Sequence, residues 1–144
     1  MLRRTLSSLI VLPTAMSLAA CHRSATGAAA GGGGAMAKAA TPAAVTAANV
    51  AMGDSIFNTG SCQRCHGMKG IGAANAPALD GAKWLQLKTG SFEEIVGIIT
   101  TGVPAAAIKD PSHKNPMNPR GGRMNLTDPQ IQAVAAYVYT LSHK

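Results

Sequence analysis

Two cysteines and a histidine in the stretch "SCQRCHG" have the types and spacing needed to hold a cofactor covalently. Cys62 and Cys65 are three positions apart, and His66 follows directly. Thiols at this spacing can form thioethers with the two vinyl groups of one porphyrin, and the adjacent histidine is then held under the iron. The motif therefore predicts one covalently attached haem c, with His66 as an axial iron ligand.

Three other kinds of site use a similar pair of cysteines. A thioredoxin-like redox motif would lie in a βαβ pattern, and no alternating strand pattern surrounds this pair. A structural zinc site needs a second pair of ligands, and His113 and His143 stand at no zinc-type spacing from the motif. A disulfide across two residues would be strained. Haem attachment is the interpretation that these residues favour.

A haem iron with histidine on one side can take a second axial ligand on the other. Met117 and Met124 lie in "NPMNPRGGRMN", where no apolar period would bury either side chain in a helix. A methionine thioether favours ferrous iron and raises the reduction potential, whereas His113 would give bis-histidine ligation and a lower potential. The geometry of the chain alone allows either methionine, and His113 is a third candidate.

The elements that must position these residues are predicted to be helices. Gly53 and Phe57 lie four apart on one helical face, and the glycine would let a second helix approach closely. Ser91 and Glu94 form a capping box that begins another helix, and Gly102 gives it a stop signal.

The isoleucines of that helix, Ile95, Ile98 and Ile99, form an apolar stripe at helical spacing. A last helix is expected to begin at the capping box of Thr127 and Gln130 and to run to about Leu141.

With these motifs in place, residues 47–144 resemble a class I cytochrome c, a small monohaem electron carrier. "GDSIF" resembles the glycine–aromatic motif of that family's first helix, and "AVAAYV" resembles its last helix, in which Tyr137 would cross Gly53. The resemblance implies an all-α fold whose N- and C-terminal helices cross around one covalently bound haem c.

The resemblance also implies roles for the residues that follow the motif. The carbonyl of Pro77 would accept a hydrogen bond from His66 Nδ1–H, which fixes the orientation of the imidazole. Leu79 would cover the haem face. Trp84 would pack on the haem edge and donate its N–H to a propionate, although simple packing explains this tryptophan equally well.

One of the two methionines matches a ligand loop. "MNPRGG" resembles the loop of a bacterial subgroup of the family, and this favours Met117 as the axial ligand. Asn118 stands where that pattern usually has proline. Met124 occupies a position that varies in the subgroup, and packing near a helix start is the simplest expectation for it.

The N-terminus has the features of a targeting segment. Residues 1–20 combine two arginines with a short apolar stretch, as a secretory signal peptide does. "LAAC" resembles the lipobox of bacterial lipoproteins, which would place lipidation on Cys21. Ordinary signal cleavage further along the chain is the alternative, and it would release a soluble periplasmic protein.

The rest of the chain divides into a linker and a domain. Residues 21–45 are rich in alanine and glycine and are predicted to form the lipidated cysteine and a flexible linker, followed by a cytochrome c domain over residues 46–144. The formal charge of +7 falls to +5 without residues 1–20, because they hold two arginines and no acidic residue.

This charge is compatible with an acidic partner protein. The basic residues are scattered and only five residues are aromatic, which argues against nucleic-acid binding. We therefore expect a one-electron carrier and not an enzyme. It would be lipid-anchored on the periplasmic side of a bacterial membrane and would shuttle electrons between respiratory or photosynthetic complexes. A fixed haem subunit of a dehydrogenase or oxidase complex and a gas-binding or peroxidatic haem protein are the alternatives.

Overall fold

The computed structural model describes residues 40–81 and 83–144. The signal peptide, the lipidation site Cys21 and most of the linker therefore lie outside the described residues, and these three predictions are not tested by the structure.

The described part of the chain is helical. Its α-helices are α1 (Ala47–Thr59), α2 (Cys62–His66), α3 (Phe92–Thr101) and α4 (Asp128–Ser142), and its 3₁₀ helices are η1 (Met68–Gly70), η2 (Ala105–Ala107) and η3 (Pro119–Met124). The described residues contain two isolated β-bridges, and one of them joins Val103 to Met117. The all-α fold predicted from the sequence is confirmed.

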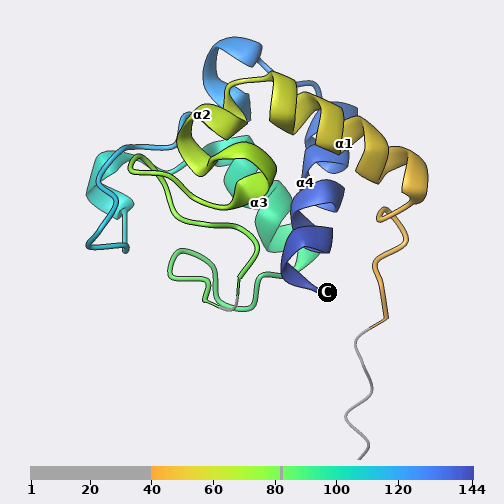
Figure 1. Cartoon of the computed structure of the whole chain (residues 1–144), viewed down its shortest axis with the longest axis horizontal. Helices are drawn as coiled ribbons and strands as arrows, with labels where there is room; N and C mark the ends of the chain where they lie inside the picture. The colour runs from red at the N-terminus through yellow and green to blue at the C-terminus, as the bar shows by residue number, and fades with distance from the viewer. Residues whose placement is uncertain (1–39, 82) are drawn as a thin grey trace, which may run out of the picture. The chain divides into compact units, whose positions relative to one another are not determined.

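Helices α1 and α4 cross each other, as Figure 1 shows, and Gly53 lies at their contact. A Cβ atom on Gly53 would lie 2.6 Å from the carbonyl carbon of Ala133 and 2.9 Å from Tyr137 Cβ. Residue 53 must therefore be glycine for the two helices to approach so closely. One turn further along, the rings of Phe57 and Tyr137 lie with their centroids 5.4 Å apart.

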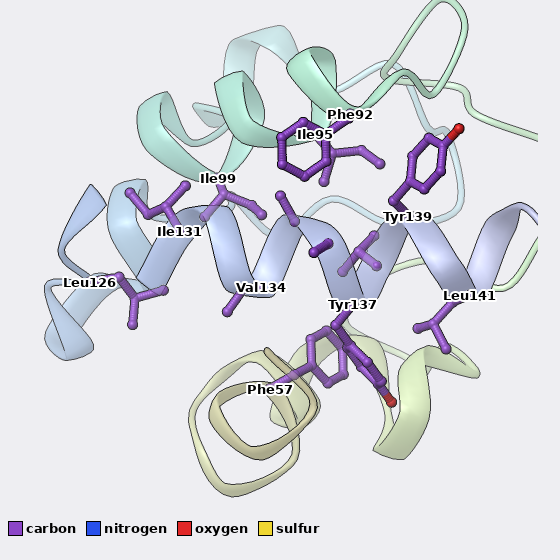
Figure 2. Close-up of a cluster of buried hydrophobic side chains, with 13 residues drawn as sticks. Phe57, Phe92, Ile95, Ile99, Leu126, Ile131, Val134, Tyr137, Tyr139 and Leu141 are labelled. Atoms are coloured by element: carbon purple, nitrogen blue, oxygen red, sulfur yellow. The ribbon is translucent and has the colours of Figure 1, made fainter. Parts of the chain in front are cut away.

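Helix α4 forms the centre of the hydrophobic core. Figure 2 shows α3 on one side of α4, with Phe92, Ile95 and Ile99 directed toward it, and Phe57 of α1 on another side. Residues 133–139 of α4 are all buried, so this helix is covered on more than one face. The packing explains why its sequence is apolar with little periodicity.

The helix starts follow the sequence signals with one difference. Ser91 Oγ accepts from the Glu94 N–H at 3.3 Å, as the capping box predicts. The carboxylate of Glu94 instead accepts from the N–H groups of Thr89 and Gly90, at 2.8 and 2.9 Å. The Glu94 side chain therefore holds the loop that precedes α3. It does not form the second hydrogen bond of the expected capping box. At α4, Gln130 Oε1 accepts from the Thr127 N–H at 2.9 Å.

The packed unit begins slightly before residue 46. Ala44 and Val45, which the sequence assigned to the end of the linker, pack against the hydrophobic core. The Val45 N–H donates to the Pro42 carbonyl at 2.9 Å, and Asn49 Nδ2 donates to the Ala44 carbonyl at 2.8 Å. Within residues 40–81 and 83–144, no helix has both the length and the apolar character needed to cross a membrane.

Candidate functional site

The two motif cysteines lie on the short helix α2. Cys62 is half-buried, Cys65 is exposed, and neither thiol forms a disulfide. Burial raises the pKa of the Cys62 thiol, while its backbone N–H opposes this effect and the neighbouring Cys65 adds to it. Both side chains line one cavity, together with His66 from the end of the same helix. The motif residues are thus presented to a common space.

The hydrogen bond expected at His66 is present. Its Nδ1 lies 3.0 Å from the carbonyl oxygen of Pro77. A carbonyl can only accept, so Nδ1 carries the proton and Nε2 keeps a free lone pair. Burial lowers the pKa of His66, and the hydrogen bond to Pro77 opposes this effect without reversing it. The hydrogen bond to Pro77 therefore holds the imidazole in the tautomer that a metal ligand requires.

A compact loop places Pro77 under the imidazole. The Gly72 N–H donates to the His66 carbonyl at 2.6 Å, and the Leu79 N–H donates to the Gly70 carbonyl at 2.7 Å. Gly70 and Gly72 have φ values of 70° and 87°, which residues with a side chain rarely adopt. The loop turns back on itself through these two glycines and brings both Pro77 and Leu79 to the cavity wall.

The cavity has a volume of about 270 Å³ and a mostly apolar lining. Residues from α1, α2, α3, α4 and the connecting loops contribute to the wall, including the isoleucine stripe of Ile95, Ile98 and Ile99. Leu79 and Trp84 also line it, as the resemblance implied. The indole of Trp84 lies against Gly90, where an added Cβ would come within 2.8 Å of Cε2. Donation by Trp84 to a propionate stays a prediction.

Met117 lies on the wall of the same cavity as His66. Its backbone is fastened to the end of α3 by two hydrogen bonds. The Val103 N–H donates to the Met117 carbonyl at 2.8 Å, and the Met117 N–H donates to the Val103 carbonyl at 3.0 Å. Gly102 has a φ of 70°, and a Cβ there would lie 2.7 Å from Pro119 N. The third helix thus ends in a turn that fixes the position of Met117.

The other two candidate ligands differ in their surroundings. Met124 is not part of the cavity lining; its Sδ instead accepts from the Ser61 N–H at 3.1 Å. His113 does line the cavity, and its Nδ1 donates to Asp110 Oδ2 at 2.7 Å. This hydrogen bond lowers the pKa of Asp110. The geometry therefore separates the two methionines and leaves Met117 and His113 at the cavity.

Several residues around the site were not found by sequence reasoning. Ser61 contacts the loop after Met117, and Asn115 Nδ2 donates to Asn75 Oδ1 at 2.8 Å across the cavity rim. These polar contacts join segments that are distant in the chain, and no local sequence signal marks them. Ser61 could only have been noted for its position directly before Cys62.

The residues present fit a covalently bound haem. The two thiols and the imidazole of α2 line an apolar cavity, and Met117 lines the same cavity. An apolar cavity suits the porphyrin face, and the thiols and imidazole suit its vinyl groups and iron. Within residues 40–81 and 83–144, no cluster of three or more His, Cys, Asp or Glu side chains could hold a metal ion by itself.

These features define an all-helical protein with a covalent haem site. The family model for cytochrome c matches residues 50–142 of the chain. The chain therefore belongs to the cytochrome c family; it carries covalently bound haem c and functions in electron transfer with redox partners. Searches of curated proteins and of solved structures gave no match.

Proposed function

We propose that this cytochrome c is a bacterial class I electron carrier with a single haem and His66 and Met117 as axial iron ligands. The observation that carries the proposal is that Cys62, Cys65, His66 and Met117 all line one apolar cavity. When bound, the haem supplies an iron that accepts and donates one electron. Cys62 and Cys65 would hold it through thioethers.

The residues around the two ligands support reversible electron transfer rather than substrate chemistry. The Pro77 carbonyl orients the His66 imidazole through a 3.0 Å contact. The two backbone hydrogen bonds between Val103 and Met117 hold the backbone of the methionine in place. A protein that occupies both axial positions leaves no position for oxygen or peroxide, and its ligands need little rearrangement when the charge on the iron changes.

Carbon monoxide and a redox titration test this part of the proposal together. The reduced protein should show no carbon monoxide spectrum after mixing at neutral pH, and its titration should follow a single one-electron wave. Rapid stoichiometric binding of carbon monoxide would instead assign the protein to the gas-binding or peroxidatic class. More than one wave would contradict a single haem.

Exposed lysines support encounter with an acidic partner. Lys69, Lys83 and Lys88 are exposed, and Lys83 also lines the cavity mouth. Positive charge near the site of electron exit would steer association with a negatively charged docking surface. The rate of electron exchange with an acidic redox protein should fall as salt rises. Lys83→Gln should weaken that dependence, whereas Lys144→Gln, at the C-terminal residue, should not.

We further propose that the protein is tethered to the periplasmic face of a membrane through acylated Cys21. Support comes from the sequence of residues 1–45: a signal-like stretch, the "LAAC" motif and an alanine- and glycine-rich segment before the packed unit. Two or three acyl chains provide stable anchoring where one does not. Cys21→Ala should move the haem-containing protein from the membrane fraction to the soluble fraction. Equal partition of the variant and the wild type would contradict the anchor.

A further inference from the structure

Two hydrogen bonds join the residue before the haem-binding motif to the loop that follows Met117. The Ser61 N–H donates to Met124 Sδ at 3.1 Å, and Ser61 Oγ donates to the Gly121 carbonyl at 3.0 Å. Ser61 directly precedes Cys62, whereas Gly121 and Met124 lie in η3. We refer to the contact among Ser61, Gly121 and Met124 as the Ser61 contact.

The methionine side chain fits closely against the end of α1. A Cβ atom on Gly60 would lie 2.7 Å from Met124 Sδ and closer still to its terminal methyl group. Gly60 also caps α1, because its N–H donates to the Ile56 carbonyl at 3.0 Å. The thioether therefore occupies the space that any side chain at residue 60 would need, and it reaches the Ser61 N–H from there.

The loop that Met124 ends has a backbone that needs external support. Arg120, Gly121 and Gly122 all have positive φ values, as does Asn125 after the loop. Positive φ is costly for residues with a side chain, such as Arg120 and Asn125. The loop is fastened at Met117 by the bridge to Val103. Toward its other end the loop has the Ser61 contact and, in addition, an ion pair between Arg120 and Asp128 of α4.

We propose that Met124 is a positioning residue, which holds the Met117 loop against the haem-attachment segment and so opposes release of Met117 from the iron. The inference rests on the proposed His66–Met117 ligation. The contact joins the chain segment of one axial ligand to that of the other. If it is broken, the loop loses an attachment and Met117 leaves the iron more often.

The chemistry of the side chain makes methionine suitable for this role. Its thioether is a weak hydrogen-bond acceptor on a flexible, apolar chain, so it can pack against the hydrophobic core and still accept from a backbone N–H. Leucine has a similar volume but no acceptor. Met124→Leu therefore removes the hydrogen bond while keeping most of the packing, and Ser61→Ala removes the second hydrogen bond of the contact.

Imidazole competition in the haem-loaded protein measures release of Met117. Added imidazole replaces the thioether on ferric iron, and the far-red methionine–iron charge-transfer band disappears. A hydrogen bond of this kind changes such an equilibrium by roughly two- to tenfold. Met124→Leu and Ser61→Ala should each lower the imidazole concentration for half-loss of the band by that factor, and Met124→Ala by more. Met52→Leu, at an exposed methionine of α1, is the matched control and should not change it.

Amide hydrogen exchange gives a second measurement that does not depend on the iron ligand. The Ser61 N–H should exchange faster in Met124→Leu than in the wild type or in Met52→Leu. Wild-type imidazole midpoints in both Met124→Leu and Ser61→Ala would overturn the proposal. A change in Met124→Ala alone would also overturn it, because packing would then be sufficient. Absence of the band from the wild type would instead overturn the assignment of Met117 as an axial ligand, on which this proposal rests.

Discussion

Gly53 of α1 and Ala133 of α4 approach so closely that a Cβ atom on Gly53 would lie 2.6 Å from the Ala133 carbonyl carbon. This approach sets the crossing of the first and last helices, and that crossing forms one side of the haem cavity through Phe57 and Val134. The core and the site therefore depend on one residue without a side chain.

Gly53→Ala should destabilise the protein, because the added methyl group would force α1 and α4 apart. Overpacking of this kind costs about 1–3 kcal/mol of the free energy of unfolding. Gly97→Ala is the matched control: Gly97 lies in α3, and an added Cβ would meet nothing within 4 Å. Alanine at residue 97 should be neutral or stabilise by up to about 1 kcal/mol. Denaturant unfolding followed by helical circular dichroism measures both, and equal effects would contradict the close crossing.

The carboxylate of Glu94 should make the free energy of unfolding depend on pH in the acid range. Its carboxylate accepts hydrogen bonds from Thr89, Gly90 and Lys88, and the bond from the Thr89 N–H is the largest cause that lowers its pKa from 4.5 to about 2. A lowered folded-state pKa stabilises the protein above the unfolded value, and this contribution is lost as pH falls from about 4.5 toward 2. The difference in unfolding free energy between wild type and Glu94→Gln should therefore shrink over that range.

Glu93→Gln is the control for this pH effect. Glu93 is exposed in the same first turn of α3, and among the described hydrogen bonds none involves its side chain. The difference in unfolding free energy between wild type and Glu93→Gln should vary less between pH 4.5 and 2 than the difference between wild type and Glu94→Gln. A pH-independent difference for Glu94→Gln would mean that its carboxylate does not hold the loop before α3.

Covalent attachment should depend on the motif cysteines alone. The double variant Cys62→Ser, Cys65→Ser should lose all haem from the polypeptide after denaturation, because serine hydroxyls do not form the thioethers. Cys21→Ala should keep its covalent haem, since residue 21 lies outside the family match. Haem staining of a denaturing gel distinguishes the double variant from Cys21→Ala. Haem retained by the double variant would show that another residue holds the porphyrin.

Local signals in the sequence predicted most of the fold. Gly53 and Phe57 indicated the helix crossing, and Ser91 with Gly102 marked the ends of α3 within a residue. These signals succeed because helix caps and close helix contacts depend on residues near one another or on a missing side chain. The sequence did not predict the hydrogen-bond partners of the Glu94 carboxylate, because they depend on the path of the preceding loop and not on the capping pattern.

The candidate site was only partly predictable. The motif of Cys62, Cys65 and His66 is continuous in the chain, and the Pro77 hydrogen bond followed from the family resemblance. The contact of Met124 with Ser61 spans 63 residues, so no local pattern could reveal it. Sequence patterns identified the residues that are expected to contact the cofactor more readily than the residues that hold them in place.

The ferric absorption spectrum of the matured protein and of two variants tests the central claim most directly. The wild type and Met124→Ala should show the far-red methionine–iron charge-transfer band in the absence of added ligand, and Met117→Ala should lack it. The reduced Met117→Ala protein should also bind carbon monoxide rapidly. A band that survives in Met117→Ala and disappears in Met124→Ala would contradict the ligation, and a wild type without the band would point to His113 in place of methionine.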